Sequence, residues 1–262
     1  MLVLDGVAVA VVGIYVTLVL FYLSIGDRES ARRWFVKSIW LALWIACPYV
    51  LLSIGDSLLE GYGLTVKGSW RALSDAAEKF LEAHRRARNW IMWEAAEEAG
   101  LYMSIIASEF GTLLGKSTSD FFSMLQYASR WFLTLYYIVT FIAPFYQIFM
   151  ILGATMLIED RFRRIGGFLY SVFLVYGPAF QFLARIVDEA LKNPATVTPN
   201  PFNPWDFLKT MDYVVHVADY MAKAAYALYK AAIHTTVGFV FALAIAIGVS
   251  LALGGVSARL SA

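Results

Sequence analysis

The stretch 131–158, WFLTLYYIVTFIAPFYQIFMILGATMLI, contains no charged residue over 28 positions. A helix needs about 20 apolar residues to cross ~30 Å of hydrocarbon, so this stretch predicts a membrane span that tilts, kinks or projects beyond the bilayer. Pro144 lies near its middle, where proline removes a backbone hydrogen bond. A hairpin turning at Pro144 would leave only about 13 residues in each half. One kinked helix is the better interpretation.

Four further uncharged stretches lie outward from this one, at 6–26, 38–55, 165–184 and 231–258. Of the 262 residues, 60% are hydrophobic and 16% are charged, against roughly 45–50% and 25% in ordinary globular domains. The sequence therefore predicts an all-α fold, a polytopic membrane protein of about five transmembrane helices. Two amphipathic outer helical segments, 56–120 and 185–230, are expected to complete a single membrane domain over residues 1–262.

Lys and Arg in short loops predict the orientation of the spans, because such residues stay in the cytoplasm. They occur in the first short connection, in the segment 159–164 and after the last span, at Arg28, Arg32, Arg33, Lys37, Arg161, Arg163, Arg164 and Arg259. With five spans, all of these positions fall on one side. The sequence predicts a multi-pass protein of the cell membrane, with the N-terminus outside and the C-terminus in the cytoplasm.

The outer segment 56–120 contains an amphipathic helical pattern. From Trp70 to residue 99, apolar residues recur at spacings of three and four, which predicts a helix that lies on the membrane or packs against partner helices. The stretch 100–115 is apolar but interrupted by Glu109. Its length favours a re-entrant or interfacial helix over a sixth span.

The outer segment 185–230 begins with a proline-rich run, 193–204, that holds four prolines and predicts a stiff, non-helical spacer. From Trp205 to Leu228 an apolar stripe at helical spacing predicts a helix that continues into the last span. Asp206 suits the first turn of that helix, where the helix dipole favours an acid.

The sequence contains no pattern of an enzyme or a metal site. His84, His216 and His234 lie far apart, and Cys47 is the only cysteine. No GxxxxGK[ST] motif is present, so the chain is not expected to couple ATP hydrolysis to its function by itself. We expect no catalytic residue, no metal and no cofactor.

The densest basic feature combines arginines with tryptophans, at Arg85, Arg86, Arg88, Trp90 and Trp93. Basic groups interleaved with aromatic rings suit single-stranded nucleic acid, because cations meet phosphates and bases stack on rings. The competing interpretation is the wet face of an amphipathic helix, with the arginines neutralised by Glu78, Glu82 and Glu94 and the tryptophans as interface anchors. The sequence leaves both open.

Polar residues inside the predicted spans point to a bundle interior or a watery path. Thr140, Gln147 and Gln181 are the candidate pore-lining residues, whereas Arg130 at the rim is expected to extend toward the interface. The last span carries a ladder of small residues that permits close helix approach, at Gly238, Ala242, Ala246, Gly248 and Ala252. This ladder serves internal packing or oligomerisation.

Two stretches carry a resemblance to a known family: PFYQIFMILG at 144–153 and RFRRIGGFLY at 161–170. This chain resembles the archaeal DNA-import membrane proteins of the CedA family in the order of its elements: a long apolar helix, a short arginine-rich turn, a glycine pair and another span. That family is related to the polytopic inner-membrane (TrbL-class) component of type IV secretion systems. The layout of spans and the large outer loop are similar as well.

This resemblance implies a membrane channel or platform of a DNA-transfer machine related to conjugation systems. It implies a homo-oligomer working with a separate hexameric ATPase and small pilus-type membrane subunits, with single-stranded DNA as the cargo and an archaeal source. The small number of Asn and Gln residues, seven in all, is typical of a thermophile. Five spans cannot enclose a DNA strand, so a channel requires the oligomer.

Two other functions remain open from the sequence. A structural membrane anchor for a filament would turn its polar span residues toward neighbouring helices, whereas a channel would turn them toward water. A small-solute transporter would need charged residues near mid-membrane, and the spans hold almost none. Import and export of DNA are not distinguished by the residues.

Overall fold

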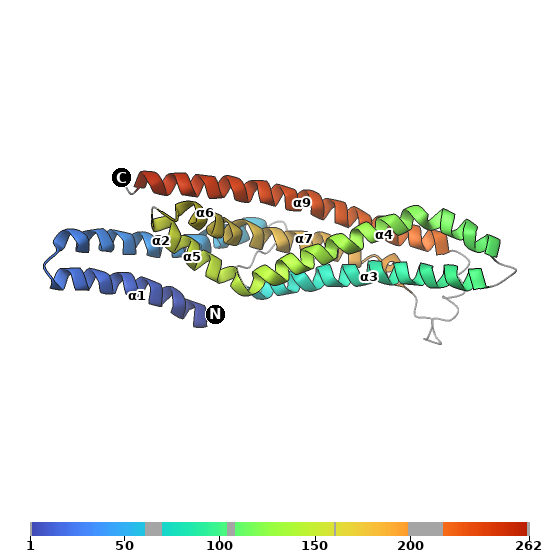
Figure 1. Cartoon of the computed structure of the whole chain (residues 1–262), viewed down its shortest axis with the longest axis horizontal. Helices are drawn as coiled ribbons and strands as arrows, with labels where there is room; N and C mark the ends of the chain where they lie inside the picture. The colour runs from blue at the N-terminus through green and yellow to red at the C-terminus, as the bar shows by residue number, and fades with distance from the viewer. Residues whose placement is uncertain (1, 61–69, 104–107, 160, 199–216, 261–262) are drawn as a thin grey trace. The chain divides into compact units, whose positions relative to one another are not determined.

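The computed structural model of the chain describes residues 2–60, 70–103, 108–159, 161–198 and 217–260, and all its regular structure is helical (Figure 1). The all-α prediction is confirmed, with no strand among these residues. The elements are α1 (Leu2–Ser24), α2 (Arg28–Glu60), α3 (Trp70–Met103), α4 (Ser108–Ile142), η1 (Ala143–Phe145), α5 (Tyr146–Ile158), α6 (Arg163–Ser171), η2 (Val172–Tyr176), α7 (Gly177–Leu191), η3 (Pro194–Thr196) and α9 (Val217–Leu260).

The chain divides into two compact units. Unit 1 comprises Met1–Leu73, Phe141–Gln181 and Val240–Ala262, and within it α1 packs on α2 and α5 packs on α6. Unit 2 comprises Ser74–Thr140 and Phe182–Phe239. The long helices α3, α4, α7 and α9 contribute residues to both units.

Within the described residues, three helical segments are long and apolar enough to cross a membrane: Thr118–Ile158, Arg163–Leu191 and Asp219–Gly254. These segments include the third, fourth and most of the fifth predicted spans, so the number is smaller than the five predicted. The first predicted span corresponds to a shorter apolar helix, Ala8–Ser24. The second, 38–55, lies inside α2, where it follows a charged first third that runs from Arg28 to Lys37.

The helix that contains 131–158 continues through Pro144. One turn of 3-10 helix, Ala143–Phe145, joins α4 to α5, and its flanking residues Ile142 and Tyr146 keep right-handed helical dihedral angles. Because proline fits the first positions of a helical segment, where its missing N–H is not needed, the chain stays helical there.

Helix α3 packs against partner helices through its apolar face. Phe80, Ala83 and Ala87 are fully buried in unit 2, and the His84 ring contacts Ser129 of α4. Of the two alternatives that the sequence left open for α3, the structure shows the packing against helices. The predicted re-entrant or interfacial helix at 100–115 includes 104–107, outside the described residues, and its flanks belong to α3 and α4.

The second outer segment is described only in part. Pro194–Thr196 form a short 3-10 helix at the start of the predicted spacer, with the Asn193 side chain accepting a hydrogen bond from the N–H of Ala195. The rest of that spacer, Trp205 and Asp206 lie outside the described residues. Helix α9 then runs from Val217 through the last predicted span.

Two prolines inside helices of unit 1 leave backbone carbonyls without their usual donors. Pro48 lies within α2, so the carbonyl of Trp44, four residues earlier, has no helical N–H to accept from. The Tyr170 hydroxyl donates to that carbonyl at 2.6 Å. The tyrosine therefore replaces the missing donor and attaches α6 to α2.

A tyrosine hydroxyl also replaces a missing backbone donor at Pro178. Residues Val172–Tyr176 form a π-helical turn, in which a carbonyl accepts from the N–H five residues later. For Phe173 that residue is Pro178, which has no N–H. The Tyr146 hydroxyl donates to the Phe173 carbonyl at 2.7 Å. A Cβ atom at Gly177 would lie 1.8 Å from this hydroxyl oxygen, so glycine makes the bond possible.

Tyr146→Phe is expected to lower the free energy of unfolding by about 1–3 kcal/mol, the cost of leaving a buried carbonyl without a donor. Tyr146 is fully buried, so water cannot take the place of its hydroxyl. A thermal melt of the purified protein in detergent measures the change. Tyr137→Phe is the control, because Tyr137 is 61% exposed, and an equal loss in both variants would contradict this role for Tyr146.

Candidate functional site

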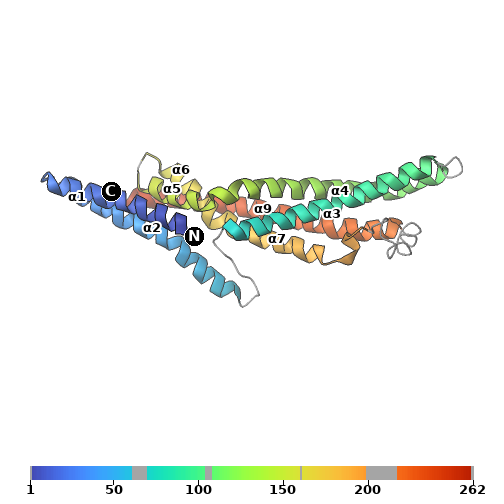
Figure 2. The same cartoon turned by 90° about the horizontal axis from the view of Figure 1, so that it is seen from below.

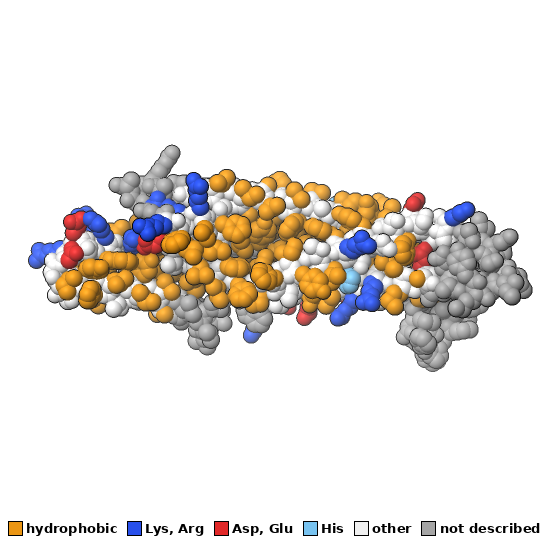
Figure 3. Space-filling model, in the orientation of Figure 1, with side chains coloured by type: hydrophobic (Ala, Val, Ile, Leu, Met, Phe, Trp, Pro, Cys, Tyr) orange, Lys and Arg blue, Asp and Glu red, His pale blue; other side chains and the backbone are white. Residues whose placement is uncertain are grey.

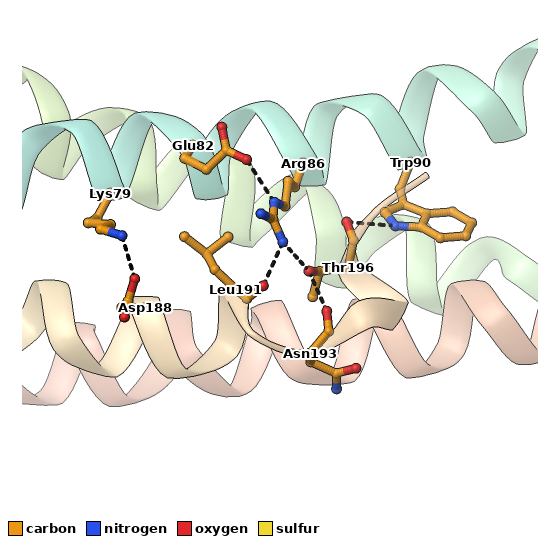
Figure 4. A network of polar contacts seen from close by, with 8 residues as sticks. All are labelled: Lys79, Glu82, Arg86, Trp90, Asp188, Leu191, Asn193 and Thr196. Carbon is orange, nitrogen blue, oxygen red and sulfur yellow. Dashed lines mark hydrogen bonds and ion pairs between the residues drawn. The ribbon is translucent and has the colours of Figure 1, made fainter. Parts of the chain in front are cut away.

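The arginine–tryptophan cluster of α3 forms part of a polar network in unit 2 (Figure 4). The Arg86 guanidinium donates to the Glu82 carboxylate at 2.8 Å, to the Leu191 carbonyl at 2.6 Å and to the Thr196 hydroxyl at 2.9 Å. The Trp90 indole N–H donates to the Thr196 carbonyl at 3.2 Å. Arg86 and Trp90 therefore join α3 to the C-terminal end of α7 and to η3.

This network assigns packing roles to two of the five residues predicted to bind nucleic acid. Trp90 is 1% exposed, so neither ring face is open to a base. The Trp93 ring is half-buried and meets Trp90 edge-on, with ring centroids 6.4 Å apart. A second link, the ion pair of Lys79 with Asp188 at 2.5 Å, joins the same two helices about two turns before Arg86 on α3.

Arg86→Met is expected to lower the free energy of unfolding by about 1–3 kcal/mol, because the Leu191 carbonyl and the Thr196 hydroxyl lose a charged donor in a half-buried place. Arg85→Met is a matched control on the neighbouring position. Arg85 is exposed, and its replacement should change stability by less than about 0.5 kcal/mol. Melts of the two variants in detergent would contradict the assignment if Arg85→Met were the less stable.

The remaining arginines of the cluster are exposed. Arg85 and Arg88 lie on the exposed side of α3, and Arg130 is exposed on α4. Arg130 follows Ser129, whose hydroxyl and carbonyl oxygens lie 2.9 and 3.0 Å from the His84 ring of α3. Figure 3 shows basic side chains and a histidine gathered over α3 and α4. We call Arg85, Arg88 and Arg130 the basic patch. Within the described part of the chain, none of the three forms an ion pair.

A groove on α4 adjoins Arg130. It has a volume of about 330 Å³ and is lined by one face of the helix, with Ser123, Gln126, Tyr127, Arg130, Trp131 and Thr134. The Tyr127 hydroxyl lies 3.1 Å from the Thr236 hydroxyl, and the Trp131 indole N–H donates to the Thr235 hydroxyl at 2.9 Å. Both rings are thereby held against α9.

The groove residues were missed as a site by the sequence analysis, which treated Arg130 as a rim residue. These residues recur at spacings of three and four in the sequence, but they lie where a predicted span begins. An arginine that extends its charged group toward the membrane interface explained Arg130 equally well. Tyr127 is 41% exposed. The groove offers a cation, hydroxyl and amide groups and a partly exposed ring, the groups that contact phosphates and stack on bases.

The predicted pore-lining residues have different surroundings. Gln147 is 9% exposed, and its Oε1 has no hydrogen-bond partner among the described residues. The Gln181 amide donates to the Gly177 carbonyl at 3.2 Å, on its own helix. Thr140 is exposed and belongs to unit 2. Within unit 1, both glutamines are therefore turned at least in part toward protein.

The ladder of small residues in α9 divides into two kinds of position. Ala242 and Ala246 are buried in unit 1, and a Cβ at Gly238 would lie 2.6 Å from Leu183 in unit 2. These three serve internal packing. Gly248 and Ala252 are exposed, and a Cβ at Gly248 would meet nothing within 4 Å. Only this second pair is open to another molecule.

No group of three or more His, Cys, Asp or Glu side chains that could hold a metal occurs among the residues that the structure describes. Cys47 is an exposed free thiol. In comparisons with known proteins, no family model, no curated protein and no solved structure matches this chain. The function is therefore inferred from the site itself and from the sequence resemblance.

Proposed function

We propose that this chain is a membrane component of a DNA-transfer machine related to conjugation systems, with energy supplied by a separate ATPase. The observation that carries the proposal is the basic patch, three exposed arginines on α3 and α4, of which Arg130 lines the groove. Cations beside an aromatic and hydroxyl-lined groove suit a single strand of DNA, in which phosphates and bases are both accessible. The sequence resemblance to the CedA family supports the same cargo.

The position of the basic patch supports uptake of DNA. Arg130 lies one residue before the apolar stretch 131–158, and in the proposed five-span topology this end of the stretch is outside the cell. The patch then meets DNA before it reaches the membrane. Exposed apolar side chains, Tyr137 and Val237 among them, lie farther along α4 and α9, where the proposal places the bilayer.

A conducting path for a DNA strand requires several copies of the chain, because few spans cannot enclose a strand. Gly248 and Ala252 are the exposed small residues through which α9 of one copy could approach another. The proposal therefore includes a homo-oligomer in the cell membrane, a hexameric ATPase and small pilus-type subunits as partners.

Marker exchange between two strains tests the proposal, with this gene deleted in the donor or in the recipient. We expect transfer to be lost when the recipient lacks the gene and to persist when only the donor lacks it. Loss in the donor alone would indicate export. Undiminished transfer in both directions would contradict a role in DNA transfer.

A second function, a structural membrane platform for a filament, is favoured by the surroundings of Gln147 and Gln181. A platform without a conducting path would turn these residues toward protein, and Gln147 is nine-tenths buried. Gln147→Leu distinguishes the two. A platform would tolerate this change with full assembly and transfer, whereas a water-lined path through the oligomer would be altered by it and DNA transfer would fall.

A further inference from the structure

His84 of α3 lies against α4 beside the basic patch. Its ring nitrogen Nδ1 lies 3.0 Å from the carbonyl oxygen of Ser129 and 2.9 Å from the hydroxyl oxygen of the same residue. Because a carbonyl oxygen only accepts, Nδ1 carries a hydrogen and donates it. In the described part of the chain, the other ring nitrogen, Nε2, forms no hydrogen bond. The ring is half-buried, and Nε2 is the nitrogen whose protonation can change while Ser129 holds the ring.

The basic patch brings cations to this ring from two helices. Helices α3 and α4 run side by side in both Figure 1 and Figure 2. On α3, Arg85 is the next residue after His84, and Arg88 is four positions away, on the same face of the helix. On α4, Arg130 directly follows Ser129. All three arginines are exposed, so His84 lies among groups that are open to a bound anion.

The carboxylates that pair with α3 lie on another face of this helix. At about 100° per residue, Lys79, Glu82 and Arg86 are each turned about 140–160° from His84. Glu82 bonds to Arg86 at 2.8 Å, and Arg86 also bonds to α7. The acid of α7 that reaches α3 is Asp188, which is paired with Lys79. This face therefore meets α7, whereas His84 meets α4.

Helix α9 contacts α4 from the side away from His84. Tyr127 and Trp131 hold α9 through their polar atoms. They stand two positions either side of Ser129 and are therefore turned about 160° from it. The nearest acid of α4 in the sequence is Asp120, nine positions before Ser129 and so about 13 Å away along the helix. The named carboxylates thus lie away from the His84 ring, and the arginines of the basic patch flank it.

We propose that His84 is a fourth phosphate-binding group of the basic patch, which binds single-stranded DNA with uptake of one proton from solvent at Nε2. The inference rests on the proposed function and adds its dependence on pH. A neutral Nε2 presents a lone pair to a phosphate oxygen and repels it, whereas a protonated Nε2 donates a hydrogen bond and carries a charge. Histidine side chains change charge between about pH 5 and 8. Protonation and phosphate binding favour each other by the same factor, so the affinity for DNA rises as the pH falls.

The test measures the anisotropy of a labelled single-stranded oligonucleotide with the purified protein in detergent, at about pH 5.5 and about pH 8. His84→Asn keeps a side-chain N–H for the Ser129 carbonyl but has no group that titrates. His84→Lys carries a charge at both pH values. His234→Asn is the matched control, because His234 is an exposed histidine of α9 outside the basic patch and the groove.

We expect the unchanged protein to bind the oligonucleotide about tenfold more tightly at the lower pH. Its slope of log affinity against log salt concentration should be steeper there by about 0.7, for one further phosphate contact. His84→Asn should keep the weaker affinity at both pH values, and His84→Lys the tighter affinity at both. His234→Asn should behave like the unchanged protein.

Two outcomes would overturn the inference and leave the proposed function in place. The first is equal affinity of the unchanged protein at both pH values. The second is a pH dependence that persists in His84→Asn, because the proton would then bind elsewhere. Absence of binding at either pH would overturn the proposed DNA contact itself, and this inference with it.

A second measurement applies even if His84→Asn does not fold. Titration calorimetry of the unchanged protein with the oligonucleotide, in two buffers of different ionisation enthalpy at about pH 6.5, counts the protons taken up on binding. We expect uptake in the unchanged protein and in His234→Asn, and none in His84→Lys. DNA binding without proton uptake in the unchanged protein would overturn the role of His84.

Discussion

Replacing Gly166 with alanine is expected to lower the free energy of unfolding by about 3 kcal/mol or more. A Cβ atom at Gly166 would lie 2.6 Å from the backbone nitrogen of Leu157 and 2.7 Å from the carbonyl carbon of Met156. Because these atoms belong to the backbone of α5, no side-chain rotation can relieve the contact, and α5 and α6 would have to separate. A thermal melt followed by size-exclusion chromatography in detergent measures the loss.

Gly13→Ala is the matched control for this prediction. It also adds a methyl group to a helical glycine, but nothing lies within 4 Å of the new atom. Its stability should stay the same or rise by up to about 1 kcal/mol, since alanine has the higher helix propensity. If the two variants melted at the same temperature, the close approach of α5 and α6 in unit 1 would be contradicted.

Reversing the charges of the basic patch is expected to have the largest effect on DNA binding. The variant carries Arg85→Glu, Arg88→Glu and Arg130→Glu. Each phosphate contact with a single strand contributes about 0.7 to the slope of log affinity against log salt concentration. Three lost contacts should lower that slope by about 2 and the affinity at low salt by at least about tenfold. Anisotropy of a labelled oligonucleotide with the purified protein, over a series of KCl concentrations, measures both quantities.

Lys116→Glu serves as the control for charge reversal on α4, because Lys116 is exposed and outside the groove. It should retain the affinity and the slope of the unchanged protein to within about one phosphate contact. An equal loss in this variant would show that the measurement reports net charge. An unchanged slope in the triple variant would remove the basic patch from the DNA contact.

The class of the fold was predictable because composition and span-length apolar runs depend on the sequence alone. The amphipathic pattern of α3 likewise predicted the face that buries Phe80 and Ala87. The roles of the tyrosines at the proline breaks were not predictable. Tyr170 and Trp44, and Tyr146 and Phe173, meet only through the packing of separate helices, and no spacing along the chain records such pairs.

The sequence located the arginines of α3 but could not distinguish the exposed ones from the one that packs against α7. Arg85, Arg86 and Arg88 look alike in the sequence, yet Arg86 alone of the three meets the carbonyl of Leu191. That difference depends on where the end of α7 packs, a property of the tertiary structure. Arg130, distant in sequence, is added to the patch because Ser129 packs on His84.

The membrane spans were likewise predictable only in part. Apolar length marks 131–158, 165–184 and 231–258, all of which fall largely in helices of membrane-spanning length. For α1, the sequence predicts a span over 6–26, whereas the structure has a shorter apolar helix there, Ala8–Ser24.

The central claim is that the basic patch handles DNA during its uptake. Marker exchange into a recipient that carries the triple variant, with its protein level matched to the unchanged strain, tests this most directly. We predict that transfer is lost in this recipient and retained in one that carries Lys116→Glu. Undiminished transfer into the triple-variant recipient would contradict the claim.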